Sequence, residues 1–135
     1  HIKGKKGADR IHSCPANLLD PAVPFPTGFD VIWMSQFLDC FSETEIVSIL
    51  KRAAKALSPN AKIYIMETLW DRQKFETASY VLTQTSVYFT AMANGNSKMY
   101  HSQDFINLVE QAGLKVERIY DNIGTGHTIL RCSVK

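Results

Sequence analysis

Hydrophobic residues follow two different spacings in the first half of the chain. Residues 29–34, FDVIWM, form an unbroken apolar run with β-branched and aromatic side chains, which is typical of a strand covered on both faces. Residues 61–69, AKIYIMETL, predict another strand. Between these runs, one face of a helix collects the apolar residues Ile46, Ile49, Leu50, Ala53 and Leu57. The order strand, helix, strand predicts a βαβ unit with parallel strands.

Both ends of this predicted helix carry local signals. Ser42 is a favourable N-cap, and Glu45, three positions later, completes a capping box. Phe41 and Ile46 have the spacing of a hydrophobic staple, which fixes the entry of the chain into a helix. The tripeptide Ser-Pro-Asn at 58–60 ends the helix, because proline cannot continue it.

The flanks of this unit carry weaker patterns. Residues 10–20 predict a short strand that runs into a loop, and three prolines within residues 21–28 predict a fixed connection. Residues 73–93 predict a long helix with two apolar faces. Such a helix needs two partner surfaces, so we expect one to be this sheet and the other a second domain, a second subunit or a ligand.

The C-terminal third predicts one more helix and two strands. Ser102 is the expected N-cap of the helix, and Gly113 is its expected C-terminal stop. The last two strands are expected near 115–121 and 127–134. The five residues 122–126 between them are too few for a parallel crossover, so this pair is predicted to be an antiparallel hairpin.

Composition and charge exclude several classes of protein. A chain of 135 residues is long enough for one domain with a core, and its net charge of +2 is too small to argue for nucleic-acid binding. No apolar run approaches the ~18 residues of a membrane helix. The three cysteines have no C-x-x-C spacing, which predicts reduced thiols in the cytoplasm and no metal site. The chain opens at His1 without a methionine, which suggests a piece of a longer protein.

Polar residues follow each of the first three predicted strands. They are found in ANLLD at 16–20, SQFLD at 35–39 and ETLWD at 67–71. In open α/β sheets, ligands bind outside the carboxyl ends of the strands. These three segments are therefore the candidate positions for functional side chains.

Residues 29–69 resemble the second half of the class I S-adenosylmethionine-dependent O-methyltransferases that methylate small hydroxylated aromatic molecules. That family combines a strand beginning with Asp, a tip ending in LHDW, an acidic helix start, a PGG-like turn and a strand ending in Glu. Residues 101–120, HSQDFINLVEQAGLKVERIY, are similar to the helix and strand that follow in the family. Order and spacing together carry this resemblance.

The resemblance implies an α/β fold with a Rossmann-like methyltransferase sheet, mostly parallel, with a C-terminal antiparallel hairpin. Residues 1–135 would form a partial, C-terminal catalytic domain. The sequence has no G-x-G-x-x-G loop for the cofactor. That loop, the acid that holds the cofactor ribose and the family's N-terminal dimerisation and substrate-capping domain would lie upstream, so we expect a homodimer of the intact protein.

Four residues match positions that border the cofactor in this family. Asn17 and Leu18 match a pair beside the adenine, although Asn17 equally fits a turn residue. Ser35 stands where the family often has a lysine near the adenine, and Gln36 beside it is expected to face the cofactor or the substrate. The implied cofactor is S-adenosylmethionine.

Two residues match the family's catalytic positions. Asp39 stands where these enzymes carry the histidine that deprotonates the acceptor hydroxyl, and Glu67 matches one of the two acids that flank it. The other acid aligns with Met99, next to Tyr100 and His101. Asp39 also fits a loop residue that makes hydrogen bonds near a helix start.

The resemblance therefore implies methyl transfer from S-adenosylmethionine to a small, aromatic, hydroxylated acceptor. The alternatives are a catalytically silent methyltransferase-like binding or scaffold module, since the histidine and one acid are lost, and a cofactor-independent interaction domain.

Overall fold

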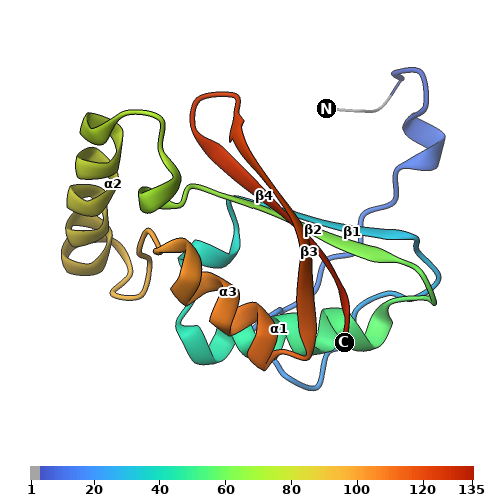
Figure 1. Ribbon diagram of the computed structural model, residues 1–135. Coiled ribbons are helices and arrows are strands. Elements are labelled where there is room, and N and C mark those ends of the chain that lie inside the picture. The colour runs from blue at the N-terminus through green and yellow to red at the C-terminus, as the bar shows by residue number, and fades with distance from the viewer. Residues whose placement is uncertain (1–3) are drawn as a thin grey trace.

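A computed structural model of the chain describes residues 4–135 as a four-stranded sheet with helices on one face (Figure 1). The strands run in the spatial order β1-β2-β4-β3. The helices and strands, in chain order, are β1 Val31–Ser35, α1 Glu43–Ala56, β2 Lys62–Glu67, α2 Glu76–Tyr88, α3 Ser102–Gln111, β3 Leu114–Ile123 and β4 His127–Val134. Short 3-10 turns at Leu38–Cys40 and Trp70–Arg72 follow β1 and β2.

The sheet is mixed. β1 and β2 are parallel and are connected by α1, which confirms the predicted βαβ unit. β4 runs antiparallel to both β2 and β3, which confirms the C-terminal hairpin. The α/β class therefore holds, while parallel pairing within residues 4–135 is limited to β1 and β2. The carboxyl ends of β1 and β2 lie together, with Ser35 beside Met66, and Glu67 faces Thr128 of β4.

The core lies between the sheet and the pair α1 and α3, which run along one side of the sheet (Figure 1). Its fully buried side chains include Ile46, Ile49, Leu50, Ile63, Ile65, Phe105, Val109 and Leu130. The capping box of α1 is confirmed: Glu45 Oε2 accepts the Ser42 N–H at 2.8 Å, and Ser42 Oγ accepts the Glu45 N–H at 3.4 Å. Gly113 follows α3 with a φ of +83°, which supports its predicted role as the stop.

Two strand predictions need correction. Residues 11–17 are extended but form no strand, because a strand needs a neighbour to pair with and this segment has none among residues 4–135. β1 is covered on one face only. On its other face Trp33 is 54% exposed and stacks on Tyr64 of β2, with 6.1 Å between the ring centroids.

The long helix predicted at 73–93 is in two parts. α2 is followed without a break by a π-helical turn, Phe89–Ala93, and neither part contains a buried residue. Neither of the predicted apolar faces is therefore buried by the described chain. α2 stands apart from the sheet, at the left of the view and away from the C-terminus (Figure 1).

The start of α3 also differs from the prediction. His101, rather than Ser102, is its N-cap, and the His101 Nδ1 accepts the Gln103 N–H at 3.1 Å. Ser102 is the first helical residue, and both its N–H and its hydroxyl donate to the Asp71 carboxylate, at 2.7 and 2.5 Å. An acid from another segment thus satisfies a free amide at the helix start.

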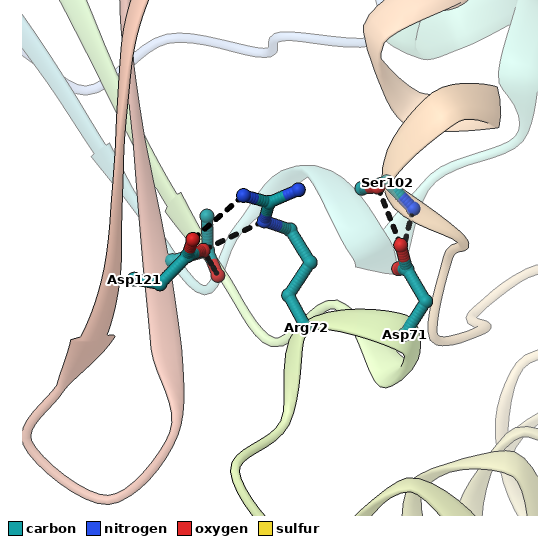
Figure 2. Close-up of polar contacts among 5 residues, drawn as sticks. Asp71, Arg72, Ser102 and Asp121 are labelled. Atoms are coloured by element: carbon teal, nitrogen blue, oxygen red, sulfur yellow. Dashed lines mark hydrogen bonds and ion pairs between the residues drawn. The ribbon is translucent and has the colours of Figure 1, made fainter.

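Asp71 and Arg72 point in opposite directions from the turn after β2 (Figure 2). Asp71 reaches α3, and Arg72 makes a two-point ion pair with Asp121 of β3, at 2.7 and 2.6 Å. Thr128 of β4 donates a hydrogen bond to the same Asp121 carboxylate at 3.0 Å. The segment that follows Glu67 is therefore held between α3 and the hairpin, which fixes the carboxyl end of β2.

Candidate active site

Glu67 is a buried acid at the carboxyl end of β2. Only 3% of its surface is exposed. Its Oε1 accepts two backbone N–H groups from the turn after β1, from Phe37 at 3.0 Å and from Leu38 at 2.9 Å. Its Oε2 is buried without a hydrogen-bond partner among residues 4–135. One oxygen therefore holds the tip of the neighbouring strand, and the other is left for another donor.

Asp39 lies in the turn that Glu67 holds. Its backbone carbonyl accepts the N–H of Lys98 at 3.2 Å, which ties the turn to the segment before α3. Its side chain is half-buried, and Oδ1 lies 3.5 Å from the thiol of Cys40, which donates to it. The turn at the carboxyl end of β1 therefore brings Asp39 and Glu67 to one edge of the sheet, as expected for the ends of parallel strands.

The two acids have raised pKa values for related reasons. Burial, followed by the charge of Asp39, raises the pKa of Glu67 from 4.5 to about 7, although the backbone donors Phe37 and Leu38 oppose the shift. Burial also raises the pKa of Asp39, opposed by the hydrogen bond from Cys40. Near neutral pH, Glu67 is therefore partly protonated.

Segment 98–100 forms a third side of the acidic site. Thr68, next to Glu67, donates its hydroxyl to the Met99 sulfur at 3.1 Å, and the Trp70 N–H donates to the Tyr100 carbonyl at 3.2 Å. Met99, which aligns with the family's second acid, thus does lie beside the strand end. Tyr100 is a polar member of this site for which no role was predicted, and its position next to Met99 was the available signal.

The residues predicted to border the cofactor lie in two separate places. Ser35 and Gln36 are exposed at the tip of β1, and Gln36 adopts a positive φ of 45°. The Gln36 carboxamide contacts the ring of His127, the first residue of β4. This tip adjoins the turn that carries Asp39, so Ser35 and Gln36 belong to the same edge of the sheet.

Asn17 and Leu18 lie in the extended segment before β1. The Asn17 carboxamide oxygen accepts the Leu19 N–H at 3.1 Å, which forms a turn and leaves the amide nitrogen of this exposed side chain free to donate. The Leu18 carbonyl accepts a hydrogen bond from the Arg52 guanidinium of α1. The contacts of Asn17 and Leu18 thus lie with the loop and α1, and they do not reach the acidic pair.

A groove lies beside Thr68, the residue that follows Glu67. It has a volume of about 510 Å³ and is bounded by α2, the segment after β2 and the hairpin loop. Its lining includes Thr68, Gln73, Phe75, Val81, Leu82 and Thr125. Thr68 directly follows Glu67, so the apolar groove and the acids are neighbours along the chain.

Residues 4–135 contain no group of three or more His, Cys, Asp or Glu side chains that could hold a metal ion. Among the helices of these residues, none is long and apolar enough to cross a membrane.

Comparison with known proteins identifies the family. A model of the O-methyltransferase domain matches residues 5–115, which is most of the chain. The chain belongs to this O-methyltransferase family. The strand tips that carry Asp39 and Glu67 lie within the matched residues.

Curated members of the O-methyltransferase family match over most of this chain. Mitomycin biosynthesis 6-O-methyltransferase of Streptomyces lavendulae is 25% identical over 117 residues, 87% of this chain and 31% of its own length. O-methyltransferase 9 of Dictyostelium discoideum is 31% identical over 117 residues, 87% of this chain and 30% of its own length. The D. discoideum protein named "Probable inactive O-methyltransferase 11" is 28% identical over 89 residues, 66% of this chain and 25% of its own length.

Solved structures of O-methyltransferases share the fold. Mitomycin 7-O-methyltransferase MmcR superposes with a TM-score of 0.81 at 22% identity, over 99% of this chain and 37% of that chain. The neocarzinostatin O-methyltransferase NcsB1, solved with S-adenosyl-L-homocysteine and 1,4-dihydroxy-2-naphthoic acid, gives a TM-score of 0.70 at 18% identity, over 89% and 33% of the two chains. The present chain thus spans about a third of the length of the proteins that it matches.

Proposed function

We propose that this chain is the C-terminal catalytic part of an enzyme that transfers a methyl group from S-adenosylmethionine to a small, hydroxylated, aromatic acceptor. Asp39 positions or deprotonates the acceptor hydroxyl, and Glu67 is its neighbour. The observation that carries this proposal is the buried Glu67, whose Oε1 holds the Asp39 turn through two amides. Membership of the O-methyltransferase family supports the reaction class.

The chemistry needs an acid whose carboxylate is a better base than usual. A free aspartate has a pKa of ~3.9 and a phenol one of ~10, so an ordinary carboxylate removes a phenolic proton poorly. Burial raises the pKa of Asp39 and reduces this mismatch. General-base catalysis contributes only ~10²–10⁴-fold, and alignment of the acceptor contributes as well. Asp39 can thus replace the family's histidine at some cost in rate.

Burial is the largest cause of the raised pKa of both acids. The charge of Asp39 adds to the effect of burial on Glu67, whose pKa rises to about 7. Glu67 is consequently partly protonated near neutral pH, and Asp39 is the carboxylate proposed as the base.

S-adenosylmethionine supplies an electrophilic methyl group when it is bound. The exposed Ser35 hydroxyl and Gln36 carboxamide at the tip of β1 are suitable donors and acceptors for such a cofactor. Asn17 keeps its amide nitrogen free to donate to an adenine ring nitrogen, with Leu18 as its apolar neighbour. These residues fit one side of the cofactor, and the glycine-rich loop is expected upstream of His1.

The groove beyond Thr68 is a suitable place for the acceptor. Its apolar lining from α2 matches an aromatic ring, and Thr68 and Gln73 offer polar atoms. The exposed apolar face of α2 also supports a homodimer or an upstream domain as its covering partner in the intact protein.

Substitution of Asp39 tests the function. In the intact protein, with radiolabelled S-adenosylmethionine and a panel of hydroxylated aromatic acceptors, Asp39→Asn should lower turnover by roughly 10²-fold and leave cofactor affinity unchanged. Asp39→His should restore part of the loss. Asp30→Asn, the same change at an exposed site before β1, is the matched control and should retain full turnover. Wild-type turnover in Asp39→Asn would refute the catalytic role.

A silent binding or scaffold module is the second candidate. It is favoured by Met99, which occupies the position of the family's second acid, and by Asp39 in place of the histidine. The relative whose name describes it as inactive shows that loss of activity is considered within the family. Cofactor binding without methyl transfer to any acceptor in the intact protein would favour this candidate.

A further inference from the structure

Tyr100 presents a buried hydroxyl with no visible partner. Only 4% of the residue is exposed, and its phenolic oxygen makes no hydrogen bond within residues 4–135. Glu67 Oε2 is likewise buried and unpaired. A buried polar atom without a hydrogen bond is costly, so it calls for an explanation. The Tyr100 hydroxyl can donate a hydrogen bond and Glu67 Oε2 can accept one. Because both are unpaired in the same part of the molecule, one shared hydrogen-bonding partner could satisfy both.

The backbone around Tyr100 is held on two sides by the acidic site. The Lys98 N–H donates to the Asp39 carbonyl at 3.2 Å, and the Trp70 N–H donates to the Tyr100 carbonyl at 3.2 Å. Segment 98–100 therefore lies between the turn after β1 and the segment after β2. Tyr100 is thus fixed in place by hydrogen bonds to both strand ends.

Packing fixes the Tyr100 ring as well. Phe105 of α3 meets it edge to face at 5.4 Å between centroids. The Lys98 ammonium lies 4.8 Å from the ring centre and ion-pairs with Glu43 at 2.6 Å. A ring held by these contacts presents its hydroxyl at one defined place.

The geometry points to Tyr100 as a positioning residue of the methyl-transfer site, whose hydroxyl donates a hydrogen bond through a buried water to the acidic cluster formed by Asp39 and Glu67. This inference rests on the proposed function. It assigns a neutral phenol to the side of the site where the family's second acid is replaced by Met99. The hydrogen bond would favour the ionised carboxylates and orient them.

The electrostatics agree with this geometry. Burial, and then the charges of Glu43, Asp39 and Glu67, raise the pKa of Tyr100 to about 12. The phenol therefore stays protonated at physiological pH and can only be a neutral donor to these acids. The other charged or titratable groups that face the cluster are Lys98 above the ring and Cys40 beside Asp39.

Tyr100→Phe tests the hydrogen bond without reference to catalysis. We expect the carboxyl titration midpoints of the cluster, followed by ¹³C NMR on the chain, to rise by about half a pH unit or more, because a donor to the carboxylates is lost. Tyr80→Phe on the exposed surface of α2 is the matched control and should leave them unchanged. Unchanged midpoints in folded Tyr100→Phe would overturn the inference.

A second measurement keeps the native side-chain shape. Replacement of all tyrosines by 3-fluorotyrosine makes each phenol a stronger donor, so the same midpoints should fall. The fluorinated Tyr100→Phe chain should not show this fall. Equal falls in both chains, or no fall in either, would contradict a bond from Tyr100.

Turnover of the intact protein separates this inference from the proposed function. We expect Tyr100→Phe to lower kcat several-fold with little change in KM. The acidic limb of the pH–rate profile should move to higher pH. If Asp39→Asn abolishes turnover while Tyr100→Phe changes neither turnover nor midpoints, the function stands and the Tyr100 inference fails. If the midpoints move while Asp39→Asn keeps full turnover, the hydrogen bond stands, and the proposed function and the positioning role fail.

Discussion

Two helices of nearly equal length, α1 and α2, are held in opposite ways. α1 has 14 residues, a capping box, and five residues buried in the core. α2 has 13 residues, no side-chain cap at its start and no buried residue. Amphipathic packing supplies most of the stability of helices in proteins. α1 is therefore stabilised by this chain, whereas α2 presents surface that this chain does not cover.

The difference matters for the site because the two helices border it from different sides. α1 begins just after the turn that carries Asp39. The acids are therefore attached to the well-packed unit of β1, α1 and β2, which is called the rigid region below. α2 lines the groove proposed for the acceptor, through Val81, Leu82 and neighbouring residues. The proposed catalytic acids are thus held by segments packed on the core, while the groove proposed for the acceptor depends on the partner that would cover α2. This chain spans about a third of the length of its relatives, so we expect it to leave the apolar face of α2 uncovered.

Truncation of apolar side chains should separate the two helices most strongly. Leu50→Ala in the fully buried face of α1 should lower the free energy of unfolding by about 2–5 kcal/mol, because it leaves a cavity. Val87→Ala on the exposed surface of α2 should change it by less than about 0.5 kcal/mol. Urea unfolding of both variants provides the measurement. Equal losses would show that α2 is packed as firmly as α1.

The pH dependence of stability should reveal the buried acid in the rigid region. The pKa of Glu67 is raised from 4.5 to about 7, so the folded chain holds a proton that the unfolded chain releases. This contribution is fully present below about pH 4.5 and is lost as the pH rises through about 7. The difference between these two pKa values corresponds to about 3 kcal/mol of unfolding free energy.

Glu67→Gln is the variant that isolates this effect, because its amide oxygen can still accept the two backbone N–H groups. Its stability should vary far less between pH 4.5 and 7. Urea unfolding at several pH values would measure both chains. A wild-type chain that becomes more stable over this range would contradict the raised pKa of Glu67.

Loss of the α1 cap should have a smaller effect. Ser42→Ala removes the acceptor for the Glu45 amide, so it should cost about 1 kcal/mol of unfolding free energy. Ser48→Ala makes the same change within α1, away from its cap, and should be neutral or slightly stabilising. Thermal unfolding of the two variants would distinguish the cap from general helix propensity. A neutral Ser42→Ala would show that the cap contributes little to the rigidity of α1.

Charge on the exposed face of α2 should change association while barely altering stability. We expect the chain to self-associate with rising concentration through this face, since exposed apolar patches of this kind mark interaction surfaces. Val87→Glu should weaken that association and shift the unfolding free energy by less than about 0.5 kcal/mol. Sedimentation velocity would follow it. A wild-type chain that stays monomeric at high concentration would count against this role.

Binding of the cofactor by this chain alone should be the weakest effect of all. The sequence contains no G-x-G-x-x-G loop, so we expect this chain to contact one side of the cofactor at most. Titration calorimetry with S-adenosylmethionine should show little or no heat. A micromolar dissociation constant would refute this expectation.

Sequence patterns predicted the rigid region well because its signals are local. The βαβ unit, the capping box at Ser42 and the hairpin each depend on neighbouring residues, and the structure confirms all three. The strand expected within 10–20 was wrong because this segment pairs with no strand among residues 4–135. Likewise, residues 29–34 carry the pattern of a strand covered on both faces, although no part of residues 4–135 buries the face of Trp33.

The site was predicted in part, for the same reason. The strand tips located Asp39 and Glu67, because the ends of adjacent parallel strands must meet. Phe37 and Leu38, whose amides bind Glu67, lie 30 and 29 residues from it along the chain. These contacts, and the burial of the Tyr100 hydroxyl, join distant segments, which no local pattern contains. The start of α3 was misplaced because Asp71, 31 residues away, binds Ser102.

The coupling of Asp39 and Glu67 is the central claim, and one NMR titration tests it most directly. With ¹³C-labelled glutamate side chains, Glu67 should titrate near pH 7 in the wild-type chain. In Asp39→Asn its midpoint should fall, because the neighbouring charge is gone, but it should stay above 4.5 since burial is the larger cause. A Glu67 midpoint near 4.5 in both chains would contradict a coupled acid pair at the ends of β1 and β2.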